Sequence, residues 1–174
     1  AEDIYRSSAT TIPETLHLLG NLDVAQKNAH NWIVSSRGFS SDVANKMLVL
    51  IDGRTVYTPL FSGVFWERQN YVLADIDRIE SISGPGGTLW GANAVNGVIN
   101  ITTKSAKDTQ GLYFEAGGGI DPRGFVNVRY GGALAPDVYY RVYGQYANRD
   151  NGQVGTATSR PAGDTWHIGQ AGFR

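Results

Sequence analysis

The sequence predicts an α+β protein in which short helices and buried strands precede a set of antiparallel strands. A helix-start pattern lies near the N-terminus, and apolar runs typical of strands occupy the middle of the chain. After Lys107, apolar and polar residues alternate regularly, as in strands. The chain contains 22 glycines, which indicate turns and close strand packing.

Two short helices are expected before the first strand. Residues 2–7 can form one helical turn that starts with acidic side chains. Thr11 is a good N-cap for a second helix, with Pro13 and Glu14 in its first turn. Gly20 is expected to end this helix.

The next segments favour strands. Short strands are expected around residues 22–24 and 32–35, on either side of a polar loop. Residues 47–51 are a continuous apolar run typical of a central buried strand, although the run alone also fits a buried helix. Asp52-Gly53 is a strong turn signal, and residues 55–57 are expected to return as the hairpin partner.

Two further strands are expected before residue 105. Isoleucines recur through residues 76–82 and predict one strand, which Gly84–Gly87 interrupts. Residues 88–92 favour a short helical turn. Residues 98–102 alternate apolar and polar side chains and are expected to complete the sheet.

After Lys107, about four segments each place apolar side chains on one face and polar side chains on the other. A short turn is expected at residues 135–137 and a longer connection at residues 148–164. Lipid-facing and lumen-facing positions of a membrane barrel alternate in this way, and so does an ordinary antiparallel sheet with one buried face. Alternation alone favours the ordinary sheet. The expected apolar-face residues are Val126, Val128, Tyr130, Tyr140, Val142, Tyr146, Trp166 and Ile168.

The composition excludes several classes of protein. The chain has 174 residues, is 41% hydrophobic and carries a formal charge of −1, which allows a core and gives no reason to expect nucleic acid as a partner. It has no cysteine, so disulfides and thiolate metal sites are excluded. No stretch approaches the ~20 apolar residues of a membrane-spanning helix. No signal peptide is predicted at the N-terminus.

The order of six short motifs is the most specific feature of the sequence. The motifs are Arg37-Gly38-Phe39, Leu50-Ile51-Asp52-Gly53, Ile79-Glu80, Gly84-Pro85, Leu89-Trp90-Gly91 and Asn96-Gly97-Val98-Ile99-Asn100-Ile101. In this order they resemble the plug domain of TonB-dependent outer-membrane receptors, which are gated transporters that import scarce nutrients. The resemblance covers about residues 1–109.

The resemblance implies a plug domain at residues 1–108, with a small mixed sheet, short helices and long loops. It implies the first four or so strands of an incomplete β-barrel at residues 109–174. The parent would lie in the outer membrane of a Gram-negative bacterium and import a siderophore, cobalamin, haem or a similar nutrient. A TonB-type energy-coupling protein would contact a segment upstream of Ala1. The chain by itself is also compatible with a soluble state.

Two segments are expected to contact the ligand. The resemblance places them at plug apices that face the outer vestibule, and both mix aromatic with polar side chains, as ligand sites do. Packing of the aromatic side chains beneath the loops, as a local core, is the alternative. The candidate residues are Asn28, His30, Asn31, Trp32, Tyr57, Phe61, Phe65 and Trp66.

Arginines are expected to hold the plug in the barrel. The resemblance implies that Arg37 pairs with carboxylates of the barrel wall, which suits a forked guanidinium; a solvated surface arginine is the alternative. The second arginine of the family usually precedes the Gly-Pro pair, and Ser83 stands there instead. Arg78, with Glu80 on the same strand face, or Arg54 is the candidate substitute.

Neither catalysis nor a cofactor nor a metal site is predicted. The glycine-rich stretch at residues 84–91 lacks the Gly-Lys-Ser/Thr ending of a phosphate loop. The three histidines are dispersed, without carboxylates at metal-ligand spacing. Arg78 and Glu80 indicate a surface ion pair rather than acid–base machinery.

A second class of function stays open: a self-standing soluble periplasmic or self-assembling interaction module with a plug-like fold. Strands that do not close into a barrel leave unpaired backbone groups at their edges, which can template pairing with another chain. Homo-oligomerisation through the C-terminal strands, most simply as a dimer, is therefore expected. The length of the parent reading frame would separate a receptor from such a module.

Overall fold

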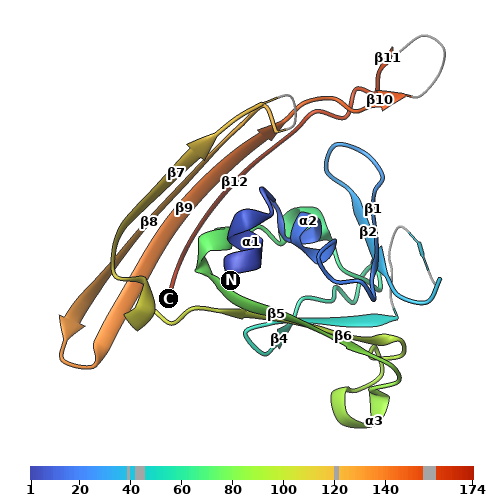
Figure 1. The fold of residues 1–174 in the computed structure, drawn as a ribbon, viewed down its shortest axis with the longest axis horizontal. Helices are drawn as coiled ribbons and strands as arrows, with labels where there is room; N and C mark the ends of the chain where they lie inside the picture. The colour runs from blue at the N-terminus through green and yellow to red at the C-terminus, as the bar shows by residue number, and fades with distance from the viewer. Residues whose placement is uncertain (39, 42–45, 120–121, 155–159) are drawn as a thin grey trace. The chain divides into compact units, whose positions relative to one another are not determined.

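The computed structural model describes residues 1–38, 40–41, 46–119, 122–154 and 160–174 (Figure 1). Phe39 of the Arg37-Gly38-Phe39 motif lies outside the described residues. The chain divides into two compact units. The first unit is Ala1–Lys27 with Asn31–Thr103, and the second is Asn28–His30 with Lys104–Arg174.

A four-stranded mixed sheet forms the centre of the first unit, in the order β4-β3-β6-β5. Strands β3 and β6 are parallel, and the other two pairings are antiparallel. All five residues of β3 are buried, which explains why its sequence is a continuous apolar run. The strands are β3 (Met47–Ile51), β4 (Arg54–Thr55), β5 (Ile76–Ser83) and β6 (Gly97–Thr103).

The Asp52-Gly53 turn joins β3 to β4 as predicted. Both residues have positive φ, 50° and 76°, as a type I′ hairpin turn requires. The Asp52 carboxylate also accepts hydrogen bonds from the backbone N–H and the hydroxyl of Thr103, at 2.8 and 2.7 Å. The turn therefore fixes the end of β6 as well as the hairpin.

Two short helices precede the sheet, α1 (Glu2–Arg6) and α2 (Ile12–Leu16). Helix α2 ends before Gly20. The prediction of its N-cap was wrong in one respect. Thr11 occupies the N-cap position, but its side chain makes no cap hydrogen bond. Instead Glu14, in the first turn, accepts a hydrogen bond of 2.6 Å from the backbone N–H of Thr10. The acidic side chain thus reaches back past the N-cap and holds the residue before it.

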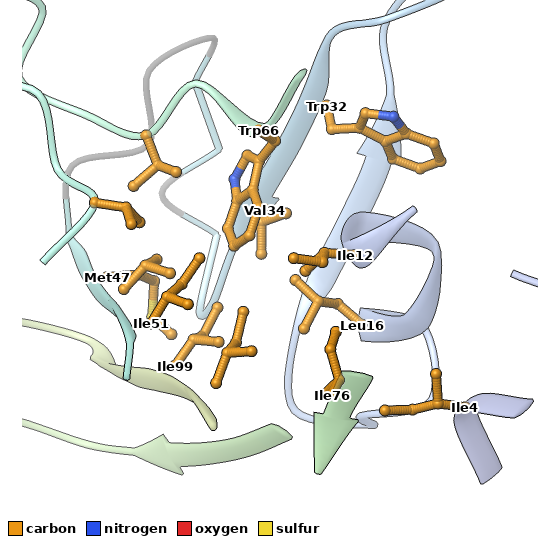
Figure 2. Packing of buried hydrophobic residues seen from close by; sticks show 14 residues of the cluster. Ile4, Ile12, Leu16, Trp32, Val34, Met47, Ile51, Trp66, Ile76 and Ile99 are labelled. Carbon is orange, nitrogen blue, oxygen red and sulfur yellow. The ribbon is translucent and has the colours of Figure 1, made fainter. Parts of the chain in front are cut away.

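The main core of the first unit lies on one face of the sheet (Figure 2). Helices α1 and α2 contribute to it, together with the hairpin formed by β1 (Asp23–Gln26) and β2 (Trp32–Ser35). The short 3-10 helices η1 (Trp66–Arg68) and η2 (Leu73–Asp75) add further side chains. The residues labelled in Figure 2 are Ile4, Ile12, Leu16, Trp32, Val34, Met47, Ile51, Trp66, Ile76 and Ile99.

A smaller cluster lies on the other face of the sheet, where α3 (Gly87–Trp90) is found (Figure 1). It contains Leu48, Leu50, Ala94 and Val98. Gly97 begins β6 here, and a Cβ at this position would collide with the carbonyl oxygen of Ile82. The Asn96-Gly97 motif therefore lets β5 and β6 approach each other.

The second unit is built on four antiparallel strands in the order β12-β9-β8-β7, in agreement with the predicted strand set. A 3-10 helix, η3 (Lys107–Thr109), leads into them. Short strands β10 (Gln153–Val154) and β11 (Arg160–Pro161) pair separately. The four strands are β7 (Gly111–Gly117), β8 (Gly124–Ala135), β9 (Val138–Arg149) and β12 (Trp166–Phe173).

The four-stranded sheet of the second unit exposes its apolar face. Leu112 is 72% exposed and Phe114 is 66% exposed, whereas Arg141 of the opposite face is only 4% exposed. One part of the predicted pattern was wrong. Trp166 pairs with Arg149 and Ile168 pairs with Ala147, so these two side chains lie on the arginine-bearing face.

Aromatic rings cover glycines across each strand pair of this sheet. Phe125 of β8 covers Gly117 of β7, and a Cβ on the glycine would come within 2.6 Å of the ring. Tyr140 covers Gly132, and Tyr143 covers Gly172, in the same directly paired geometry. A slip of one residue would move each ring away from its glycine, so these pairs fix the strand register.

We expect Ile99→Ala to destabilise the first unit by about 3 kcal/mol, because a fully buried isoleucine leaves a cavity when it is truncated. The measurement is urea unfolding followed by the NMR signal of the Trp66 indole, which belongs to the same core. Ile82→Ala is the matched control on the neighbouring strand, where the side chain is 45% exposed. Equal losses in the two variants would contradict the core assignment.

Candidate functional site

The connection between β1 and β2, residues 27–31, is a compact loop, which we call the Asn28 loop. The backbone N–H of Lys27 donates to the carbonyl of Asn31 at 2.8 Å and closes the loop. Within it, the N–H of His30 donates to Oδ1 of Asn28 at 3.1 Å. Asn28, His30 and Asn31 remain partly accessible, while Ala29 is buried.

The tip of the Asn28 loop, residues 28–30, belongs to the second unit and contacts two side chains of that unit. Asp164 Oδ2 accepts a hydrogen bond of 2.8 Å from the N–H of Ala29, and Oδ1 accepts one of 2.8 Å from the N–H of Gly152. The His30 ring stacks on the indole of Trp166, with 4.5 Å between centroids and an interplanar angle of 19°. Asp164 therefore joins the loop tip to the start of the connection between β9 and β12.

These hydrogen bonds change the acidity of Asp164. Donation by the Ala29 N–H lowers the pKa of Asp164 below its ordinary value, since it stabilises the charged form. Desolvation opposes this effect, and the Gly152 N–H and the nearby His30 reinforce it. The carboxylate is thus the stable form at neutral pH.

Trp32, the residue after the Asn28 loop, is buried, unlike the accessible candidates beside it. Its side chain belongs to the hydrophobic core and contacts the His17 ring edge-on at 6.1 Å. In the first segment, the accessible candidates are therefore Asn28, His30 and Asn31.

The second candidate segment is residues 57–70, and its first part, residues 57–66, forms a loop that we call the Phe61 loop. The N–H of Thr58 donates to the carbonyl of Gly63 at 2.8 Å, and Ser62 adopts a positive φ of 55° at the turn. Leu60 and Phe61 project from this turn, 82% and 55% exposed. The loop thus presents apolar side chains on a closed backbone turn.

The remaining aromatic candidates of this loop divide between surface and core. Phe65 contacts Phe61 edge-to-face at 5.1 Å, and the Arg68 guanidinium lies 5.9 Å from the centre of the Phe65 ring. Tyr57 is partly exposed, whereas Trp66 is buried in the core. The accessible aromatic surface of the loop is therefore Tyr57, Phe61 and Phe65.

The candidate plug-retaining residues lie on two elements of the first unit. Arg37 is exposed in the turn after β2 and has a positive φ of 59°. Arg78 on β5 pairs with Asp77 at 3.0 Å and with Glu80 at 3.3 Å. Glu80 also accepts a hydrogen bond of 2.9 Å from Asn100. Arg78 and Glu80 thus form a surface pair with each other.

Asp164 and Trp166 were missed by the sequence reasoning. Asp164 lies 135 positions after Ala29, and no motif links the two residues. Trp166 was expected on the apolar face of its strand. Only the pairing of β12 with β9 places it on the other face.

Among the described residues, no group of three or more His, Cys, Asp or Glu side chains could bind a metal ion. No helix in the described part of the chain is long and apolar enough to cross a membrane.

Lowering the pH should release the Asp164 hydrogen bonds. Because the pKa of Asp164 is lowered by folding, its contribution is complete above the ordinary aspartate value of about 3.9 and is lost as the pH falls through the lower, folded pKa. The amide proton shifts of Ala29 and Gly152, measured by NMR during acid titration, report this change. Asp164→Asn is the control that removes the titrating group. A midpoint at or above the ordinary value would contradict the hydrogen-bond assignment.

The chain is similar to known receptors in sequence and in fold. It is 35% identical over 123 residues to a vitamin B12 transporter, BtuB, of Vibrio cholerae, and 32% identical to that of Vibrio vulnificus. Each alignment covers 69% of this chain and 19% of the relative, so the chain spans only a small part of the length of these proteins. The ferric yersiniabactin uptake receptor FyuA of Yersinia pestis matches 99% of the chain and 27% of its own, with a TM-score of 0.70 and 22% identity.

A family model matches the N-terminal part of the chain. The TonB-dependent Receptor Plug Domain model matches residues 1–98, which include β3, β5, both candidate loops and all the described motif residues up to Val98. The resemblance stated from the six motifs is therefore confirmed. The chain belongs to the family of TonB-dependent receptor plug domains.

Proposed function

We propose that this chain is the plug and the opening barrel strands of an outer-membrane receptor that binds and actively imports a scarce nutrient. The observation that carries the proposal is the plug-family match over residues 1–98. We assign residues 1–108 to the plug and residues 109–174 to the barrel wall. The receptor would lie in the outer membrane of a Gram-negative bacterium.

The exposure pattern of the second unit supports the barrel assignment. A water-soluble sheet buries its apolar face, but here Leu112 and Phe114 are exposed while Arg141 and Arg149 are buried. Lipid-facing positions of a barrel are apolar and the opposite positions are polar. Arg141 is further held by the carbonyl of Lys104 at 3.1 Å.

The proposed ligand is a small nutrient of the vitamin B12 or ferric siderophore class, with haem or a similar compound as the next candidates. Its plug contacts would be Asn28, His30 and Asn31 in the Asn28 loop, and Tyr57, Phe61 and Phe65 in the Phe61 loop. The vitamin B12 transporters to which the chain is 32–35% identical make vitamin B12 the first compound to test.

The proposal gives the plug two interaction partners, the barrel wall of the same receptor and an energy-coupling protein. Carboxylates of the barrel wall would pair with Arg37. The wall would also contact Arg78 and Glu80, which lie on the edge strand β5. A TonB-type energy-coupling protein would supply the force that shifts the plug. No bond-making chemistry is required.

Deletion of the gene that encodes this chain should abolish the uptake of one nutrient. The measurement is the accumulation of radiolabelled vitamin B12, ferric enterobactin and haem by the parent and the deletion strain. Uptake of the affected compound should also be lost when the energy-coupling protein is removed. Unchanged uptake of all three compounds would contradict the proposed ligand class.

The open strand edges favour a second property, self-association of the 174-residue chain. Among the described residues, the edge strands β7 and β12 each have one neighbouring strand, and pairing of two copies would cover both these edges and the exposed apolar face. We expect light scattering of residues 1–174, across a dilution series in the micromolar range, to show dimers or larger species, and residues 1–108 to remain monomeric. Leu112→Lys with Phe114→Lys is the matched variant that should reduce the association. A monomeric parent chain at every concentration would exclude this property.

A further inference from the structure

The Asn28 loop is shaped by side chains that lie far away in the sequence, and we infer that Asp164 and Trp166 are positioning residues for this loop. The inference rests on the proposed function, because that function assigns ligand contacts to the loop. It assigns a role to two residues that lie beyond the plug-family match, which ends at residue 98.

Asp164 can hold two segments at once because its carboxylate has two acceptor oxygens. Oδ2 takes the Ala29 N–H of the loop, and Oδ1 takes the Gly152 N–H. Gly152 permits this approach, since a Cβ there would lie 3.1 Å from Oδ2. The charge makes both bonds stronger than bonds between neutral groups.

Trp166 supports the next residue of the loop. Its indole stacks on the His30 ring, and aromatic contacts of this kind add stability beyond the area that they bury. The local Asn28–His30 hydrogen bond and the Lys27–Asn31 closure define the backbone turn. Asp164 and Trp166 then fix the amide of Ala29 and the ring of His30.

A loop that is ordered before the ligand arrives loses less conformational entropy on binding. The polar atoms of Asn28, His30 and Asn31 belong to this ordered loop. The two positioning residues therefore fix the loop in the conformation that would bind a ligand, without contacting the ligand themselves.

The first test measures the loop without any ligand, in the 174-residue chain. We expect Asp164→Ala to speed the hydrogen exchange of the Ala29 and Gly152 amides about tenfold, because each loses its acceptor. Asp164→Asn keeps one carbonyl oxygen, so only one of the two amides should stay protected. Asp164→Glu keeps both acceptors and should restore most of the protection of both amides.

The second test measures the aromatic contact. Trp166→Ala should abolish the ring-current shift of the His30 ring protons, and Trp166→Phe should preserve most of it. His167→Ala is the matched control, because His167 lies on the opposite face of the same strand and should leave the His30 signals unchanged. An unchanged Ala29 amide in Asp164→Ala, or unchanged His30 signals in Trp166→Ala, would overturn the positioning role.

A ligand titration separates this inference from the proposed function. Vitamin B12 and ferric enterobactin are added to the parent chain and to Asp164→Ala, and the amide shifts of Asn28, His30 and Asn31 are followed. We expect weaker binding in the variant and its recovery in Asp164→Glu. Shifts of equal size and affinity in parent and variant would overturn the positioning role and keep the ligand role. If hydrogen exchange changes as expected but neither compound shifts the loop amides, the ligand role of the loop is overturned and the positioning role is kept.

Discussion

The parallel pairing of β3 with β6 is the constraint on which the rest of the first unit depends. Parallel strands cannot be joined by a tight hairpin, so residues 52–96 must leave one end of the sheet and return to the other. Hydrogen bonds close both ends of the pair. Asn96 N–H donates to the Lys46 carbonyl at one end, and the Asp52 carboxylate accepts from Thr103 at the other. The long return contains the Phe61 loop, the edge strand β5 and the segment that carries α3.

The elements that could be predicted from the sequence are those with strong local signals. Residues 47–51 are apolar because both faces of the strand are covered, and Asp52-Gly53 favours the type I′ turn that is found. The pairing partner of each strand and the sheet face of each side chain were harder to predict, because periodicity identifies a strand but not its neighbour. Trp166 and Ile168 illustrate this: the strand was predicted, but its register with β9 decides which side chains face Arg149.

The candidate site was predictable in part for the same reason. Loop composition indicated aromatic residues near a ligand, yet it could not separate Phe61, which is exposed, from Trp66, which fills the core. Burying a side chain as large and apolar as that of Trp66 stabilises the folded state, which accounts for its place in the core. The Asp164–Ala29 contact could not be predicted at all, because it depends on the folding of two segments at opposite ends of the chain.

The hairpin β1–β2 connects the candidate loop to the core without sharing the backbone ladder of the central sheet. Among the described strands, β1 and β2 pair only with each other, and the hairpin contacts the core through side chains such as Trp32 and Val34. One side-chain hydrogen bond, from Asn96 to the Ser36 carbonyl at 2.9 Å, joins its end to the start of β6. A shift of the hairpin would therefore disturb side-chain packing and leave the β3–β6 ladder intact. In physical terms, this hairpin can shift at a lower free-energy cost than the strands of the central sheet.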